Sequence, residues 1–240
     1  MSWKKQKQYK HIILYVCFVA LNKIDGARMK LLIFSDIHYP IGRLETIESS
    51  IDNEKPNNVA LLGDNIELSM FRDHKKAYRE FYDKFDNIFP IRRSIVIVGD
   101  NDYQYSDMHS IRGEIDALIE RRPINRSNLI FFKIGNANFF HGNLEKQLYV
   151  EKLGQFFVKS ANHISYDLAP QILSGLVRMH FKISKDEYLF LGHLHYLRII
   201  KKNVFCGTLN YRFMPFPASL GYVAVEHNNF RIRRVRIVRI

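Results

Sequence analysis

The sequence predicts a layered α/β protein whose functional residues lie at the ends of buried strands. Short continuous apolar runs, beginning with Leu31–Phe34, alternate along the chain with segments of helical spacing. A strand covered on both faces reads as such a run, because the alternation of polar and apolar residues is lost. Several of these runs end in Asp or His, often next to Gly. Open α/β sheets bind ligands at the carboxyl ends of their strands, so these residues are the candidate site.

Composition favours one globular domain with anionic partners. The 240 residues are 47% hydrophobic and 25% charged, which suits a soluble protein with a sizeable core. Lys and Arg outnumber Asp and Glu by 36 to 24. This net charge of +12 favours nucleic acid, nucleotides or acidic membrane surface, although a basic proteome gives the same surplus. The two cysteines, Cys17 and Cys206, form no CxxC pair, so we expect a reducing compartment, the cytoplasm.

The first 28 residues do not read as part of the domain. Four lysines between positions 4 and 10 precede the apolar run 12–21, as in a signal peptide, but no Ala-x-Ala-like site follows in 22–28. The run is shorter than the roughly 20 residues of a membrane-spanning helix. Met29 begins the first strand at once. We expect 1–28 to be a dispensable extension, or residues upstream of the true start, with a peripheral membrane anchor as the alternative.

Strands and helices alternate in the first half of the chain. The predicted strands are 31–34, 59–62 and 95–98, and the predicted helices are 43–53, 71–89 and 111–119. Leu44, Ile47 and Ile51 give the first helix its apolar face, and Pro56 lies beyond its end. Pro90 closes the second helix.

The second half reads differently. Strands 129–134 and 137–140 flank a Gly135-Asn136 turn and predict a hairpin. Helices 145–159 and 170–181 exceed what a connection needs, so the stretch of about 145–182 is a candidate helical insert over the site. The remaining predicted strands are 188–191, 204–209, 222–226 and 230–240. The last is arginine-rich and is interpreted as an edge strand, or as a surface for a phosphate backbone. No linker or internal repeat interrupts the single domain 29–240.

Five strand ends carry side chains that bind metals. They are Asp36 with His38, Asp64, Asp100, His141, and His193 with His195. Carboxylate and imidazole together suit manganese, iron, zinc or nickel. Any one of these residues alone is more often a turn or cap, but five repeats in order are hard to attribute to chance. Seven ligands exceed one tetrahedral ion and fit two ions that share a carboxylate, an arrangement that hydrolyses phosphoesters.

The ordered motifs D-x-H, G-D-N, G-D-N-D, H-G and G-H-x-H resemble those of the calcineurin-like metallophosphoesterase superfamily, from about Met29 to the C-terminus. The resemblance implies a four-layer α/β/β/α sandwich of two mixed sheets, with a dinuclear metal centre at their edge. It implies that Asp36, His38 and His195 hold the first ion, that Asp64 bridges, and that Asp100, His141 and His193 complete the second. It also implies a metal-dependent phosphodiesterase or phosphatase, with manganese the first ion to test in vitro.

The third motif departs from this family. Gly-Asn-His-Asp or Gly-Asn-His-Glu is usual, whereas this chain has Gly99-Asp100-Asn101-Asp102. Asp100 then replaces a neutral amide ligand, and Asn101 replaces the histidine that assists the leaving group. Asparagine cannot deliver a proton near neutral pH, and general acid catalysis contributes roughly 10²–10⁴-fold. Asn101 and Asp102 are the candidate catalytic residues, and a register in which Asn101 is the metal ligand is the alternative.

Three functions remain open. The first is hydrolysis of a small phosphoester by a metal-activated water. The second is a metal-dependent nuclease acting on DNA or RNA, which the net charge of +12 favours. The third is a degenerate, non-hydrolytic metal-binding or scaffold protein, suggested by Asn101 but opposed by the intact histidines at 38, 141, 193 and 195.

Overall fold

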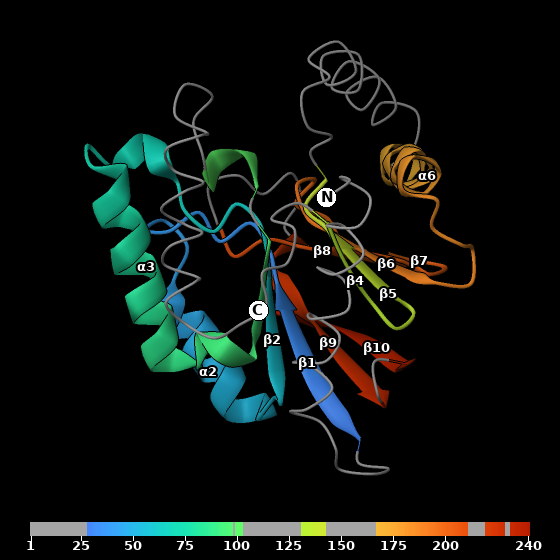
Figure 1. Cartoon of the computed structure of the whole chain (residues 1–240), viewed down its shortest axis with the longest axis horizontal. Helices are drawn as coiled ribbons and strands as arrows, with labels where there is room; N and C mark the ends of the chain where they lie inside the picture. Colours follow the sequence, from blue (N-terminus) through green and yellow to red (C-terminus); the bar gives the residue numbers. More distant parts are fainter. Residues whose placement is uncertain (1–27, 98, 103–130, 143–166, 211–218, 229–230) are drawn as a thin grey trace, which may run out of the picture.

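The computed structural model describes residues 28–97, 99–102, 131–142, 167–210, 219–228 and 231–240. In this part of the chain two five-stranded sheets lie face to face, and helices cover their outer sides (Figure 1). The predicted helices 111–119 and 145–159 and the N-terminal extension lie outside the described residues.

The first sheet has the strand order β10-β9-β1-β2-β3. Its strands are β1 (Met29–Phe34), β2 (Asn58–Leu62), β3 (Ser94–Ile97), β9 (Gly221–Asn228) and β10 (Arg231–Arg239). β1, β2 and β3 are parallel, whereas β9 is antiparallel to both β1 and β10. Every residue of β2 and β3 is buried, which explains why their sequences are continuously apolar after the first residue of each, Asn58 and Ser94.

Two helices cover one face of this sheet. α2 (Leu44–Glu54) matches the prediction within one residue and ends at Lys55, which adopts a left-handed conformation. α3 (His74–Ile88) begins three residues later than predicted. The carboxylate of Asp73 accepts a hydrogen bond from the Lys76 amide and caps the helix there. The expectation that Phe71 begins the helix is therefore wrong: it follows the short 3₁₀ turn Leu68–Met70 in an extended conformation.

The second sheet has the order β4-β5-β6-β8-β7 and is covered by α6 (Leu168–Phe181). Its strands are β4 (Phe131–Ile134), β5 (Ala137–Phe140), β6 (Tyr188–Leu191), β7 (Leu197–Ile200) and β8 (Asn203–Cys206). The predicted hairpin of β4 and β5 is confirmed. The strand predicted at 204–209 corresponds to β8, which pairs with β7 in a hairpin. The sequence does not predict β7, because its four residues are too few to show a pattern.

Three apolar clusters separate four layers. Within β1, Leu32 and Phe34 face α2 and α3, whereas Leu31 and Ile33 face the second sheet. A third cluster, which includes Leu189, fills the space between the second sheet and α6. The predicted α/β/β/α sandwich of two mixed sheets is thereby confirmed. No helix among the described residues is long and apolar enough to cross a membrane.

Candidate metal centre

Both sheets contribute side chains to one site. β1, β2 and β3 run parallel in the first sheet, and β5 and β6 run parallel in the second, so the loops that follow them leave at the sheets' carboxyl edges. Two groups of potential metal ligands form there. The first contains Asp36, His38 and His195, and the second contains Asp64, His141 and His193. Within each group the donor atoms all lie within 4.8 Å of one another.

The first group combines two residues that follow β1 with one that follows β6. Nε2 of His195 lies 3.0 Å from Oδ1 of Asp36. The other carboxylate oxygen of Asp36 accepts hydrogen bonds from the amide of His193 and from the hydroxyl of Ser35. Asp36 is fully buried; burial acts to raise its pKa, but the neighbouring His195 leaves that pKa below its ordinary value. The carboxylate is therefore held charged inside the protein.

Asp64 connects the two groups. Its Oδ1 lies 3.3 Å from Nε2 of His141, in its own group, and its Oδ2 lies 3.8 Å from Nε2 of His38, in the other. This is the position that a carboxylate shared by two ions would take. Asn101, which follows β3, donates from its backbone amide to Oδ1 and from its side chain to Oδ2 of Asp64, at 2.9 and 2.8 Å.

The hydrogen bonds of two histidines determine which ring nitrogen faces Asp64. Nδ1 of His141 lies 2.8 Å from the carbonyl oxygen of Leu62, which can only accept, so Nδ1 carries the proton. Nδ1 of His38 likewise lies 3.0 Å from a carboxylate oxygen of Glu67. Metal-binding histidines are oriented in this way by carbonyl and carboxylate partners. In the neutral imidazole this leaves Nε2 of His141 without a proton and turned toward Oδ1 of Asp64, the orientation in which both atoms could bind one cation.

Five of the six grouped residues have a positive φ. The angles are 52° for Asp36, 51° for His38, 50° for Asp64, 66° for His193 and 57° for His195. The other described non-glycine residues with positive φ are three lysines in turns or helix ends. Such conformations are costly and concentrate at functional sites. Asp36 and His38 lie beyond the end of β1, so these left-handed turns bring their side chains together.

Glycines before the ligands make room for side chains of the neighbouring strands. A Cβ on Gly99 would lie 2.1 Å from Oδ1 of Asp64 and 2.7 Å from Nε2 of His141. A Cβ on Gly63, whose φ is +89°, would lie 2.5 Å from Nδ1 of His141. The glycines of these motifs are thus needed for the close approach of the strand ends.

Glu67 was not recognised in the sequence. Besides accepting from His38, it accepts a hydrogen bond from the hydroxyl of Ser69, and its amide donates to the carbonyl of Tyr39. It is nine-tenths buried, which is unusual for a glutamate. Its place three residues after Asp64, at a strand end, is the only signal that the sequence offered.

The remaining predicted residues follow β3. Asp102 accepts hydrogen bonds from the amides of Gly99 and Ile66, at 2.8 and 2.7 Å, and so joins the loops after β2 and β3. Burial and the charge of Asp64 raise the pKa of Asp102 to about 8, while the two amides act in the opposite direction. Asp100 lies in the 3₁₀ turn Asp100–Asp102, and its side chain is outside the described part of the structure.

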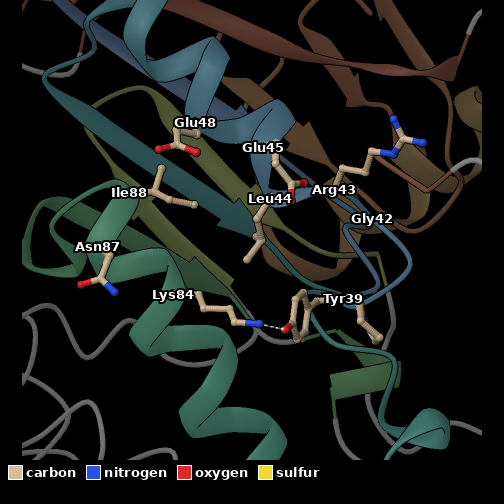
Figure 2. Close-up of a pocket in the computed structure, with 10 residues that line it drawn as sticks. Tyr39, Gly42, Arg43, Leu44, Glu45, Glu48, Lys84, Asn87 and Ile88 are labelled. Atoms are coloured by element: carbon tan, nitrogen blue, oxygen red, sulfur yellow. Dashed lines mark hydrogen bonds between the residues drawn. The ribbon is translucent and has the colours of Figure 1, made fainter.

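A separate pocket of about 690 Å³ lies between α2, α3 and the loop that follows His38 (Figure 2). Its lining residues are Tyr39, Pro40, Gly42, Arg43, Leu44, Glu45, Glu48, Lys84, Asn87 and Ile88, and none of them belongs to the two ligand groups. Figure 2 shows Lys84 pointing to the hydroxyl of Tyr39, to which it donates a hydrogen bond.

Comparison with known proteins finds similarity of structure only. No family model and no curated protein matches the sequence. Similar solved structures include YfcE, a phosphoesterase from E. coli, with 14% identity and a TM-score of 0.45 over 87% of this chain and 98% of that one. A novel archaeal phosphodiesterase has 14% identity and a TM-score of 0.46 over 88% and 100%. A predicted phosphoesterase from Streptococcus pneumoniae has 14% identity and a TM-score of 0.43 over 89% of this chain and 90% of that one. At this distance, function has to be inferred from the residues of the site.

Proposed function

We propose that the protein is a phosphoesterase that uses two divalent metal ions. Asp36, His38 and His195 would hold one ion, and Asp64, His141 and His193 the other, with Asp64 shared between them. The main support is the position of Asp64, whose two carboxylate oxygens face Nε2 atoms from different groups. Fixed tautomers and nearly complete burial of the carboxylate support the same reading.

The donor set fits a particular class of ion. Carboxylate oxygens and imidazole nitrogens without thiolate suit manganese, iron, zinc or nickel, and manganese is the first to test. Two such ions supply Lewis acidity, which lowers the pKa of water and neutralises phosphate charge. Asn101 lies against the shared carboxylate and can donate a hydrogen bond, but it has no proton to deliver to a leaving group. We therefore expect substrates with good leaving groups to be favoured.

Hydrolysis of bis(p-nitrophenyl) phosphate with added Mn²⁺, together with bound-metal analysis, tests the proposal. Asp64→Ala should lower the metal content and abolish turnover, whereas Asp52→Ala, at an exposed carboxylate on α2, should change neither. If Asp64→Ala keeps both metal and activity, a shared carboxylate at Asp64 is wrong. p-Nitrophenyl phosphate under the same conditions distinguishes diesterase from monoesterase activity.

The roles of Asp100 and Asn101 need their own comparison. Metal content of Asp100→Ala against Asn101→Ala identifies the ligand, since only its loss should deplete the second ion. Asn101→His should speed hydrolysis of a substrate with a poor leaving group more than that of an activated one. No gain on the poor leaving group would show that a missing acid is not what limits the enzyme.

A non-hydrolytic scaffold is the second candidate, because Asn101 stands where a proton donor is expected. Bound metal without turnover in any of manganese, nickel, iron or zinc would favour it over the enzyme.

A further inference from the structure

The edge strand β10 carries an unusual density of arginine. Five of its nine residues are Arg231, Arg233, Arg234, Arg236 and Arg239, here called the arginine edge, and all five are exposed. Among the described strands β10 pairs only with β9, so it lies at the margin of the first sheet. Charged side chains on such a margin hinder pairing with other chains, but that role requires neither arginine nor so many cations.

Most of this charge is not neutralised. Arg236 forms an ion pair with Glu54 at 2.6 Å, and Arg234 lies 4.0 Å from Glu226. Arg231, Arg233 and Arg239 have no acidic partner among the described residues. The guanidinium group presents a planar set of donors that binds phosphate through two parallel hydrogen bonds, so an exposed row of arginines suits a polyanion.

A bulge shapes the arginine edge. The register with β9 shifts between Ile232 and Arg234, so Arg233 is an additional residue in the strand. In a regular strand Ile232 and Val235, which are three residues apart, would point to opposite faces; the bulge at Arg233 lets both pack against the core between the sheets. The doubled Arg233-Arg234 thus adds a cation without disturbing the buried face.

The arginine edge leads to the candidate metal centre. β10 runs parallel to β1, because both are antiparallel to β9. Arg239 pairs with Gly221, and continuing the β1–β9 register by two positions brings Ser35, the neighbour of Asp36, to the same level. Two strand spacings make this separation roughly 10 Å, and the row extends roughly 24 Å back to Arg231, since its bulge leaves seven strand rises.

A contact supports this placement. A Cβ on Gly221 would lie 2.7 Å from Cδ2 of Leu197 and 3.1 Å from Cα of Arg239. Leu197 comes two residues after His195, a candidate ligand. The carboxyl end of the arginine edge is therefore packed close to the segment that supplies His195 to the first ligand group.

We propose that the arginine edge binds the phosphate backbone of a nucleic acid and directs it to the metal centre, which makes polynucleotides the substrate class. The binding requires no base-specific contact, because phosphate contacts position a strand without reading its sequence. The catalytic part of this inference rests on the proposed function, whereas the binding part does not.

Fluorescence anisotropy of a labelled single-stranded oligonucleotide, titrated in EDTA at several NaCl concentrations, tests the binding part. The triple variant R231Q/R233Q/R239Q should lose about tenfold or more in affinity, and its slope of log K against log salt should be shallower by about 2. The control K75Q/K76Q/R79Q removes the same charge from exposed positions on α3 and should keep most of the affinity and the full slope.

Equal losses in the two triple variants would overturn the proposal, since net charge alone would then explain binding. Unchanged affinity in R231Q/R233Q/R239Q, or displacement of the oligonucleotide by poly-glutamate as effective as by unlabelled oligonucleotide, would also overturn it. With Mn²⁺, the variant should hydrolyse the small aryl diester normally and the oligonucleotide more slowly. Oligonucleotide binding without hydrolysis of either substrate would refute the proposed function while leaving the docking surface supported.

Discussion

At the scale of single residues, the site depends on side chains that hold the ligands as much as on the ligands themselves. Glu67 is the clearest case, since it accepts from Nδ1 of His38 at 3.0 Å and directs Nε2 toward Asp64. Losing such a partner typically lowers metal affinity about 10- to 100-fold. Glu67→Gln should therefore weaken Mn²⁺ binding by at least about tenfold, as measured by competition with a chelator.

The matched control is Glu48→Gln, at an exposed glutamate on α2, which should bind Mn²⁺ like the unmodified protein. If Glu67→Gln also binds normally, the orientation of His38 does not depend on this carboxylate.

Gly99 gives a second prediction. A Cβ at this position would overlap Oδ1 and the amide nitrogen of Asp64, at 2.1 and 2.3 Å. Gly99→Ala should displace Asp64, lower Mn²⁺ affinity and destabilise the fold by about 1–3 kcal/mol. Gly175→Ala, on α6, is the control, because a Cβ added there would have nothing within 4 Å. Alanine is also more favourable than glycine in a helix by about 1 kcal/mol. In urea unfolding, the free energy of unfolding should fall for Gly99→Ala and rise for Gly175→Ala. An unchanged free energy of unfolding in Gly99→Ala would contradict the close packing.

Some of these residues could be read from the sequence and others could not. His193 and His195 follow an apolar run directly, so local pattern sufficed to mark them. The place of Glu67 near Asp64 does not show its role, which depends on a contact with His38, 29 positions away. The positive φ of Asp36 and His38 was also hidden, because neither is a residue type that demands such a conformation.

At the scale of elements, Arg178 adds polar contacts to the apolar packing between α6 and the second sheet. Arg178 donates to the side chain of Asn203 at 2.7 Å and to the carbonyl oxygens of Ser184 and Glu187 at 2.5 and 2.9 Å. Arg178→Met keeps the apolar stem but leaves these acceptors unpaired, so it should cost about 2 kcal/mol in urea unfolding. Lys185→Met, in the exposed turn beyond the helix, should cost little. Equal costs would show that Arg178 does not anchor the helix.

β9 gives the protein a sensitivity to acid. His227 is 1% exposed, and burial lowers its pKa to about 4. The unfolded chain binds a proton near the ordinary value of about 6.5, so stability from this group is present above that pH and is lost as pH falls toward 4. Between pH 7.5 and 4.5, the unmodified protein should lose about 2–3 kcal/mol more than His227→Phe. Equal losses, measured by urea unfolding at both pH values, would exclude this residue as the cause.

Element patterns explain why the sheets were easier to predict than their boundaries. β2 and β3 are buried throughout, so their apolar runs stand out, whereas β7 alternates over four residues and was missed. The predicted start of α3 is too early because Phe71 continues the apolar pattern of the helix. Asp73, which caps the N-terminus, marks where the helix begins.

At the scale of the whole molecule, each ligand group draws on both sheets. Asp36 and His38 come from the first sheet and His195 from the second, while Asp64 comes from the first and His141 and His193 from the second. The apolar cluster between the sheets already holds them together, and bound ions would add a second connection at their edge. Metal binding should therefore stabilise the entire fold and not only the loops of the site.

Removing the metal tests this coupling. Mn²⁺ at about 100 times its dissociation constant should stabilise the folded state by about 2.7 kcal/mol for each site. Each kcal/mol raises the melting temperature of a domain of this size by about 2–4 °C, so EDTA should lower it by roughly 5–10 °C or more. His141→Ala, which removes a ligand supplied by the second sheet, should retain only part of this shift, because the ligands of the first group stay intact. A melting temperature that is the same with Mn²⁺ and with EDTA would mean that the ions, if bound at all, do not connect the sheets.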